Sequence, residues 1–354
     1  MNRDAPRVER MRTQLVGWLG GLTVAAVALS MPGSAVGGGQ ARTTARSAAG
    51  NTPRTPWGDP DLQGDWTSEP EYGVPFERPA EFGERQWLTD KEFAERLAQA
   101  QRRDEDDVAA IDVLTGGVNM PTAPVPHWRE QATNSRRTSL VIDPPNGRIP
   151  PRTPQSRAGP PARTCGGLLT GDPCDSAQEY GLHVRCIIHG SSFPEAMFPT
   201  LYNANLRVVQ GPGFVAITYE MIHDTRVIPL DGRSPLSPAI RLWLGDARGR
   251  WEGDTLVVET ANFTDKTNYR GAGKALRLVE RFIRVDEETL HYEVTAVDPA
   301  TWTAPWTAAL DRKARPPGLG LFEYACHEGN YGLFYMLSTA RAAEKSRERD
   351  SVPR

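Results

Sequence analysis

The chain has 354 residues, of which 39% are hydrophobic and 24% charged, and its formal net charge is −3 at pH 7. This length allows one large domain or two ordinary ones, and the composition excludes both a disordered tail and a multi-span membrane protein. No strongly basic region is present, so we expect no nucleic-acid partner.

The N-terminal segment 1–35 has the order of a secretory signal peptide. Four arginines lie between residues 3 and 12, an uncharged run spans 15–31, and small residues follow it. The run is short for a membrane span, so we expect cleavage, a flexible leader at 36–55, and a periplasmic or secreted chain with no stable membrane span. An uncleaved anchor is the alternative.

Export makes the four cysteines informative, because an oxidising compartment favours disulfides. Four cysteines permit three pairings. We favour Cys165 with Cys174, which would close a Gly/Pro-rich loop, and Cys186 with Cys326, which would tie the middle of the chain to its end. Free buried thiols are the alternative, and the absence of a Cys-x-x-Cys pair disfavours a tetrathiolate zinc site.

The mature chain is expected to form a single β-rich domain over 56–345, followed by an exposed tail at 346–354. Residues 62–66 open with a Gly-x-Trp pattern that predicts a strand. A capping box with Thr89 at its start predicts a helix that ends near Arg103. Pro, Gly and Arg are abundant at about 117–180, which indicates a loop-rich insertion.

From residue 182 onward, short runs of Val, Ile, Leu, Tyr and Phe recur between turn signals. This pattern is typical of an antiparallel meander or barrel, so the predicted class is mainly β with one N-terminal helix and long Pro/Gly-rich loops. A short terminal helix is expected at about 332–341. The predicted strands are 183–189, 206–210, 213–221, 223–229, 241–244, 255–263, 276–285, 289–297 and 321–327.

His223 is the leading candidate for chemistry. Strict alternation from Val215 through Tyr219 places it at the end of the apolar, inward face, with Asp224 on the opposite face. A bulge at 222–224 would reverse these orientations, and Asp224 is expected, with His223, to be a catalytic residue. An imidazole in a pocket suits general acid or base catalysis, whereas a core histidine with satisfied nitrogens is the alternative.

A second polar cluster follows in residues 322–331. Alternation puts Glu323 and His327 on one face, as an oriented acid–base pair, and Tyr324 on the other. Tyr324 or Tyr219 would supply a proton. Glu328 and Asn330, in contrast, are interpreted as organising a turn.

A mononuclear zinc or iron site of His223, His327 and one carboxylate is conceivable, but no His-x-His or His-Glu-x-x-His spacing supports it, and we expect no cofactor. The sequence contains no Gly-x-Ser-x-Gly, Walker or dinucleotide-binding pattern. A serine hydrolase, an ATPase or a Rossmann dehydrogenase is therefore disfavoured. Two tryptophans suit stacking of an aromatic ligand, although core packing is their usual role. The expected ligand-binding residues are Tyr219, Trp302, Trp306, Tyr324, His189 and Arg185.

Several strings carry a resemblance. They are WGDPDLQG at 57–64, DPPNGRIP at 143–150, EMIHD at 220–224, RWEGDTLVVET at 250–260 and YACHEGNY at 324–331. Together they resemble a large family of exported proteins from soil-type Gram-negative bacteria. The resemblance implies a disulfide between Cys186 and Cys326, and it implies no catalytic residues. The opening at 64–66 and the later meander look similar to lipocalin-like barrels, which is a likeness of fold and not of chemistry.

From these residues we expect an exported enzyme that performs acid–base chemistry, as a lyase, isomerase or hydrolase, on a small apolar or aromatic molecule in a barrel pocket. The alternatives are a non-catalytic periplasmic binding protein for the same kind of ligand, and a scaffold that binds the envelope or another protein. The enzymatic hypothesis requires His223 and His327 to approach one cavity.

Overall fold

The structure, a computed structural model, describes residues 52–115, 135–157, 174–188, 197–200, 202–266 and 269–351. All of them belong to one compact unit, Arg46–Arg354. The expected signal peptide at 1–35, nearly all of the leader at 36–55, Cys165 and His189 lie outside the described residues.

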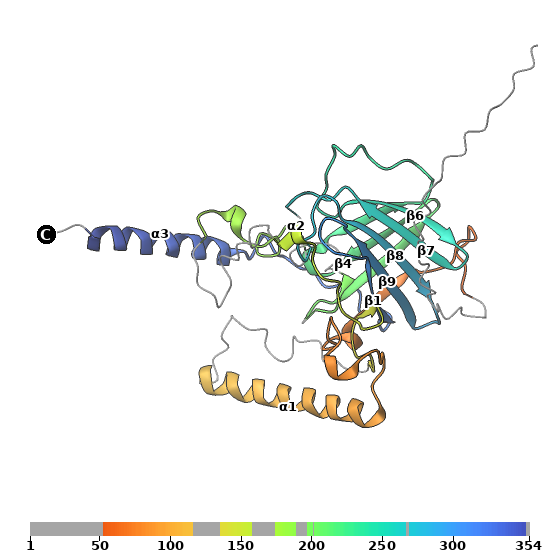
Figure 1. Ribbon diagram of the computed structural model, residues 1–354, viewed down its shortest axis with the longest axis horizontal. Helices are drawn as coiled ribbons and strands as arrows, with labels where there is room; N and C mark the ends of the chain where they lie inside the picture. Colours follow the sequence, from red (N-terminus) through yellow and green to blue (C-terminus); the bar gives the residue numbers. More distant parts are fainter. Residues whose placement is uncertain are drawn as a thin grey trace, which may run out of the picture. The chain divides into compact units, whose positions relative to one another are not determined.

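Ten strands of the described chain form one antiparallel, barrel-shaped sheet, which confirms the predicted fold class. Its hydrogen-bonded order is β5-β4-β3-β1-β10-β9-β8-β7-β6, and β2 pairs with β10. Figure 1 shows β6, β7, β8 and β9 running side by side in the curved sheet. The strands are β1 (Gly64–Thr67), β2 (Val141–Asp143), β3 (Asn205–Gly211), β4 (Phe214–Tyr219), β5 (Thr225–Pro229), β6 (Asp246–Glu252), β7 (Thr255–Ala261), β8 (Arg277–Arg284), β9 (Thr289–Val297) and β10 (Trp306–Ala314).

Alternation of apolar and polar residues fixes which face of each strand is buried. Leu206 pairs with Tyr219 and Val208 with Ile217, so the apolar residues of β3 and β4 share the inner face of the sheet. We expected the barrel interior to hold a ligand. At the positions of these β3 and β4 residues it is instead filled by a continuous hydrophobic core, which includes side chains from β1 and from β7 to β10.

Strands β5 and β6 are the two ends of the hydrogen-bonded order, and they lie against each other. The close approach depends on Gly249 of β6. A Cβ atom there would lie 2.5 Å from Leu230 Cδ2 and 2.8 Å from Ile228 Cγ2. Glycine is therefore required where side chains from the β5 segment cover the backbone of β6.

Seven of the ten predicted strands are confirmed: the strand expected at 62–66 is β1, and the others are β3, β4, β5, β7, β8 and β9. Residues 183–188 form turns instead of the strand expected at 183–189, because Cys186 adopts a φ of 57° and its N–H donates to the carbonyl of His183. Residues 241–244 are also not a strand, since β6 begins only after Gly245, whose φ is 71°.

The segment 321–327 has no strand pairing either, and the prediction of a strand there is wrong. Gly318 and Gly320, with φ of 89° and 63°, bend the chain before it, and a disulfide at Cys326 fixes it. Strand β10 was missed. Its inward-facing Arg312 interrupts the apolar alternation, and this guanidinium is buried by donating to the carbonyls of Met197 and Ala204.

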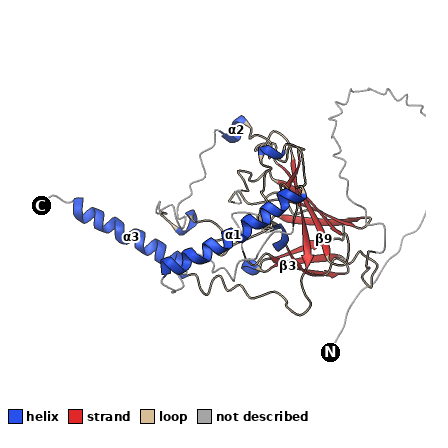
Figure 2. Ribbon diagram, turned by 90° about the horizontal axis from the view of Figure 1, so that it is seen from below, coloured by secondary structure: helices blue, strands red, loops and turns tan. Residues whose placement is uncertain are grey.

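The helices of the described chain are α1 (Asp90–Thr115), α2 (Pro154–Arg157) and α3 (Tyr331–Ser351), and Figure 2 shows α1 and α3 as the long ones. The capping box is present, because Thr89 N–H donates to Glu92 Oε2 at 2.8 Å and Glu92 N–H donates to Thr89 Oγ1 at 3.3 Å. Both α1 and α3 continue beyond the predicted ends, so α3 includes much of the expected tail at 346–354. No helix within the described ranges is long and apolar enough to span a bilayer.

Candidate functional site

Two cavities of ligand size lie in the described part of the chain. The histidine cavity has a volume of about 300 Å³ and is lined by residues from 218–223 and from 321–328. The aromatic cavity has a volume of about 370 Å³ and is lined by residues from 71–76, Leu140, residues 198–200 and Arg270.

The histidine cavity begins where strand β4 ends. Tyr219 closes the β4–β5 hairpin by donating its N–H to the carbonyl of Asp224 at 2.8 Å. Between them, Ile222 and His223 adopt left-handed φ values of 63° and 51°. The strand alternation therefore stops before His223, and its side chain is exposed instead of continuing the inward face. Asp224 is half-buried and does not line the cavity.

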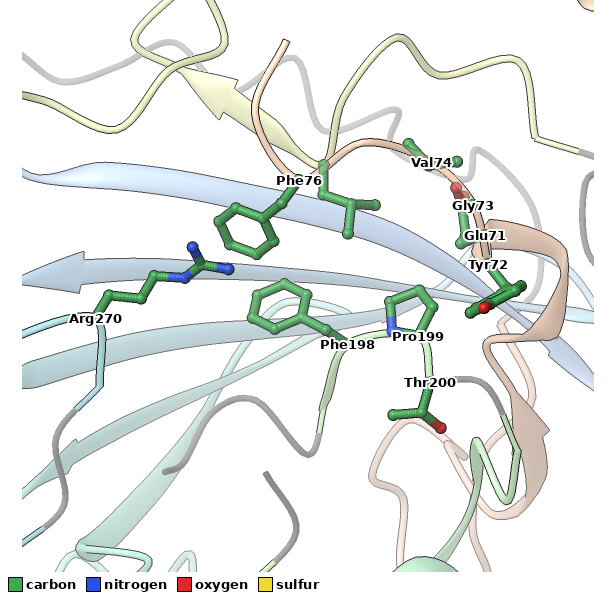
Figure 3. A pocket seen from close by; sticks show the side chains of 10 residues that line it. Glu71, Tyr72, Gly73, Val74, Phe76, Phe198, Pro199, Thr200 and Arg270 are labelled. Atoms are coloured by element: carbon green, nitrogen blue, oxygen red, sulfur yellow. The ribbon is translucent and has the colours of Figure 1, made fainter. Parts of the chain in front are cut away.

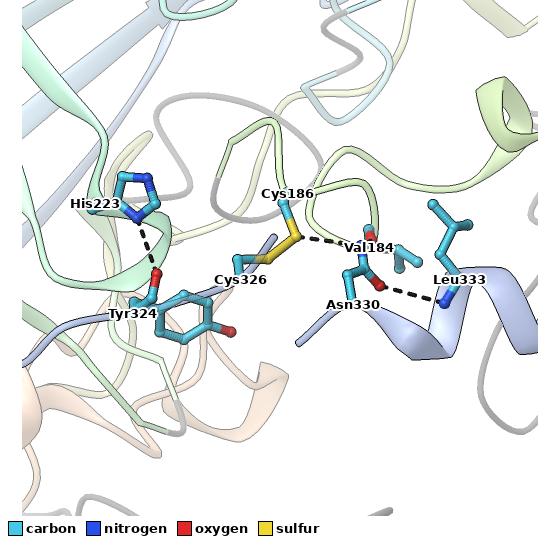
Figure 4. The surroundings of a disulfide bond; sticks show 7 residues. All are labelled: Val184, Cys186, His223, Tyr324, Cys326, Asn330 and Leu333. Atoms are coloured by element: carbon cyan, nitrogen blue, oxygen red, sulfur yellow. Dashed lines mark hydrogen bonds between the residues drawn. A yellow bond between two sulfur atoms is a disulfide. The ribbon is translucent and has the colours of Figure 1, made fainter. Parts of the chain in front are cut away.

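One hydrogen bond orients the imidazole of His223. Its Nδ1 lies 3.0 Å from the backbone carbonyl oxygen of Tyr324, as Figure 4 shows. A carbonyl oxygen only accepts, so Nδ1 carries the proton of the neutral ring and Nε2 carries the lone pair. The two motifs, about a hundred residues apart in sequence, thus meet in one cavity.

A disulfide holds the second motif in place. Cys186 and Cys326 are joined at 2.03 Å, as the resemblance implied. Asn330 Nδ2 donates to the carbonyl of Val184 at 2.8 Å, so the same two segments are also linked by a hydrogen bond (Figure 4). Cys174 is disulfide-bonded as well, whereas its predicted partner lies outside the described residues.

Not every residue expected at this site lines it. Glu323 and Tyr324 do, and Glu323 is exposed. Burial, together with the neighbouring Tyr202, raises the pKa of Tyr324 well above its usual value, so its phenol keeps its proton. His327 is exposed and does not line the cavity, and no hydrogen bond joins it to Glu323 within the described chain. The expected acid–base pair is therefore not assembled, and the expectation that both imidazoles line one cavity is not met, so any chemistry here depends on His223 without His327.

Tyr219 lines the cavity but is only 3% exposed, and its hydroxyl accepts from Arg226 Nη1 at 3.3 Å on the inner face of the sheet. Burial raises the pKa of Tyr219, partly opposed by Arg226. This phenol belongs to a buried polar cluster on the inner face, whereas Tyr324 is half-buried.

The two tryptophans expected to stack on a ligand lie in the core. Trp302 and Trp306 are 3% and 0% exposed, their rings meet edge to face at 5.5 Å, and neither lines the cavities described above. Arg185 is half-buried in the turn that contains Cys186 and lines neither cavity. The remaining predicted ligand residue, His189, is outside the described residues.

The aromatic cavity lies beside a strap, residues 69–78, which runs along β2 and β10. Val141 N–H donates to the carbonyl of Phe76 at 2.9 Å, and Asp311 N–H donates to Glu71 Oε1 at 3.2 Å. Phe76 and Phe198 pack edge to face at 5.0 Å, as Figure 3 shows. This site was not predicted from the sequence, because its residues come from the Pro-rich segment and from loops that carry no periodic signal.

The outer face of the sheet next to this cavity carries a group of charged side chains around His291. His291 Nδ1 lies 2.5 Å from Asp311 Oδ1, and its Nε2 lies 3.1 Å from Glu293 Oε1. Burial lowers the pKa of His291, but the hydrogen bonds to the two carboxylates raise it to about 9. Both ring nitrogens of this imidazolium donate hydrogen bonds to carboxylates, so neither is available to accept a proton. His291 is therefore a structural cation and not a catalytic base.

Arg137 connects this cluster to the aromatic cavity. Its guanidinium lies 3.5 Å from both Glu71 Oε1 and Asp311 Oδ2. Burial raises the pKa of Glu71, partly opposed by Arg137.

Within the described ranges, no group of three or more His, Cys, Asp and Glu side chains is arranged to hold a metal ion. No protein-family model matches the chain, and no curated protein matches it.

Proposed function

We propose that the protein is an enzyme that performs acid–base chemistry on a small apolar or aromatic molecule in the histidine cavity. One observation carries this proposal. The bond from His223 Nδ1 to the Tyr324 carbonyl sets the tautomer in which Nε2 is a base, inside a cavity of about 300 Å³. The barrel interior is packed, so the reaction takes place at the end of β4 and not in the lumen.

The proton transfers follow from the groups that line the cavity. His223 Nε2 removes a proton from the bound molecule. Tyr324 lines the same cavity and keeps its proton, so its phenol donates a hydrogen bond to the atom on which negative charge develops. The imidazolium of His223 then returns the proton, to the leaving group of a lyase reaction or to the new position in an isomerisation, and a hydrolase would add a water activated by the same imidazole.

The lining also limits the substrate. Leu321, Phe322 and Ala325 supply apolar surface, and Glu323 and Glu328 place carboxylates at an exposed position. Glu220 is buried, but it accepts hydrogen bonds from two asparagines and lies 3.6 Å from Arg315. The two exposed carboxylates favour a neutral or cationic substrate over an anionic one.

We further propose that this chemistry takes place outside the cytoplasm. The disulfide between Cys186 and Cys326 supports export, because such bonds persist in oxidising compartments. The sequence of residues 1–35 supplies a signal for it.

A reference reaction tests the proposed base without a known substrate. 5-Nitrobenzisoxazole is a small aromatic molecule that opens to a cyanophenolate when a base removes the proton on C3 and the N–O bond breaks. We expect saturable turnover by the purified chain, measured by the absorbance of the phenolate. His223→Ala should lower kcat by about 10²-fold, because a positioned base contributes on that order.

His183→Ala is the matched control, since His183 is an exposed histidine in a turn and does not line the cavity. Its turnover should equal that of the parent chain, and thermal melting should show that both variants are folded. Equal turnover by His223→Ala and the parent, or no rate above buffer for the parent, would contradict the proposal. Saturable binding of the probe without turnover would instead favour the non-catalytic carrier.

A further inference from the structure

The aromatic cavity contains a cation, Arg270, that forms no ion pair with a carboxylate of the described residues. Arg270 is half-buried, and its guanidinium carbon lies 3.7 Å from the centroid of the Phe76 ring. Its Nε atom is buried, and no residue of the described chain accepts a hydrogen bond from it. A guanidinium removed from water in this way is stabilised when an anion completes its hydrogen bonds.

The other charged group of the cavity, Glu71, has a cationic partner, while its Oε2 atom accepts no hydrogen bond within the described chain. Glu71 accepts from the backbone N–H of Asp311 at 3.2 Å and lies 3.5 Å from the guanidinium of Arg137. Among the described residues that line the cavity, the charged group without an ionic partner is therefore Arg270. This distribution disfavours a cationic ligand and favours an anionic one.

The walls of the cavity fit a flat apolar group. The rings of Phe76 and Phe198 meet at 5.0 Å with an interplanar angle of 79°, and Val74 and Leu140 add aliphatic surface. Figure 3 shows the Arg270 guanidinium directed toward the two rings. Aromatic rings prefer this kind of edge and face contact, and a volume of about 370 Å³ accommodates a small ligand.

The backbone of Arg270 is held in an unusual conformation. Its φ is 51°, and that of Gly271 is 94°. Arg152 Nη2 donates to the carbonyl of Arg270 at 2.8 Å, and the same atom would lie 2.7 Å from a Cβ at Gly271. A non-glycine residue in the left-handed region persists only where its surroundings enforce it. Arg152 is thus a positioning residue for Arg270.

From these contacts we propose that the aromatic cavity is a second ligand site, which binds a small aromatic carboxylate. The ring packs against Phe76 and Phe198, and the carboxylate pairs with the guanidinium of Arg270. The planar fork of arginine matches both oxygens of a carboxylate, which a lysine ammonium does not. This site does not depend on the proposed chemistry of the histidine cavity.

Calorimetric titration of the full chain with benzoate tests the site. A ligand of this size is expected to bind with a Kd on the order of 0.1 mM. Arg270→Gln should weaken benzoate binding by about tenfold to a hundredfold, the range expected for a charge-assisted pair. The affinity of Arg270→Lys for benzoate should lie between those of the parent chain and Arg270→Gln. Benzamide, which lacks the negative charge, should bind weakly and equally to all three proteins.

Arg148→Gln is the matched control, because Arg148 is an exposed arginine that lines neither cavity. It should bind benzoate as the parent chain does, and so should His223→Ala, which separates this site from the histidine cavity. Equal affinity of the parent and Arg270→Gln for benzoate, or no heat of binding by the parent at about 10 mM benzoate, would overturn the proposal. Thermal melting of Arg270→Gln shows whether a loss of binding comes from unfolding.

Discussion

Two clusters of charged side chains occupy opposite faces of the same sheet. The inner cluster is the ion pair of Arg226 and Glu280, with the hydroxyls of Tyr219, Tyr292 and Thr260 around it. The side chains of Arg226 and Glu280 are 3% and 0% exposed, and Arg226 Nη2 lies 2.6 Å from Glu280 Oε2. Burial lowers the pKa of Arg226, but the neighbouring Glu280 raises it more, so the guanidinium stays charged. The tyrosine phenols stay protonated because burial raises their pKa.

The outer cluster is His291 with Asp311, Glu293, Arg137 and Glu71. It contains similar ion pairs, but its members are less buried, with 18% of the His291 side chain and 36% of the Asp311 side chain exposed. It also contains an imidazole, the only side chain whose usual pKa lies near neutrality. In the folded chain the pKa of His291 is raised to about 9, so a rise of pH through that value discharges the imidazole of the outer cluster. The Arg226 guanidinium of the inner cluster, whose pKa lies above its ordinary value, stays charged over the same range.

One residue of each cluster also lines one of the two cavities. Tyr219 joins the inner cluster to the histidine cavity, and Glu71 joins the outer cluster to the aromatic cavity. The two proposed ligand sites are thus supported by networks with different sensitivity to pH.

The largest effect is expected from breaking the inner pair. Glu280→Gln leaves the guanidinium of Arg226 buried without a negative partner, which should lower the free energy of unfolding by about 3–5 kcal/mol. Urea denaturation followed by fluorescence measures this change. The double variant Arg226→Met with Glu280→Leu should be more stable than Glu280→Gln, because it removes both charges. A double variant at least as unstable as the single one would show that the charges themselves stabilise the barrel.

An intermediate effect is expected from the outer cluster, and it depends on pH. The pKa of His291 in the folded chain, about 9, lies above the ordinary value of 6.5, so the protonated ring stabilises the fold. This stabilisation is complete below the ordinary pKa and is lost as the pH rises through the folded one. Its upper limit is about 3 kcal/mol.

His291→Gln should therefore flatten the dependence of unfolding free energy on pH above neutrality, as measured by denaturation at a series of pH values. Arg250→Gln is a suitable control, since Arg250 does not touch the cluster. If the curves of the parent and His291→Gln run parallel up to high pH, the outer cluster is not the pH-sensitive element of the fold.

The sequence predicted the strands well where apolar and polar residues alternate, as in β7, β8 and β9. It failed where a backbone conformation that depends on tertiary contacts ends the pattern, as at Cys186 and His223 with their positive φ. Strand β10 was missed because Arg312 is buried by carbonyls that lie far away in sequence. The aromatic cavity was missed for the same reason, since nothing local indicates that Arg270 lies over Phe76.

The smallest effect on stability is expected from an exposed ion pair, which serves as the reference for the buried pairs of both clusters. On the outer face, Arg250 Nη1 lies 2.6 Å from Glu259 Oε1, but the side chains are 51% and 43% exposed. Water and salt screen such a pair, so Arg250→Gln should cost less than about 1 kcal/mol, and less still at high ionic strength. Urea denaturation at low and high salt measures this. A cost comparable with that of Glu280→Gln would mean that burial does not set the strength of these pairs, and the contrast between the inner and outer clusters would then lose its physical basis.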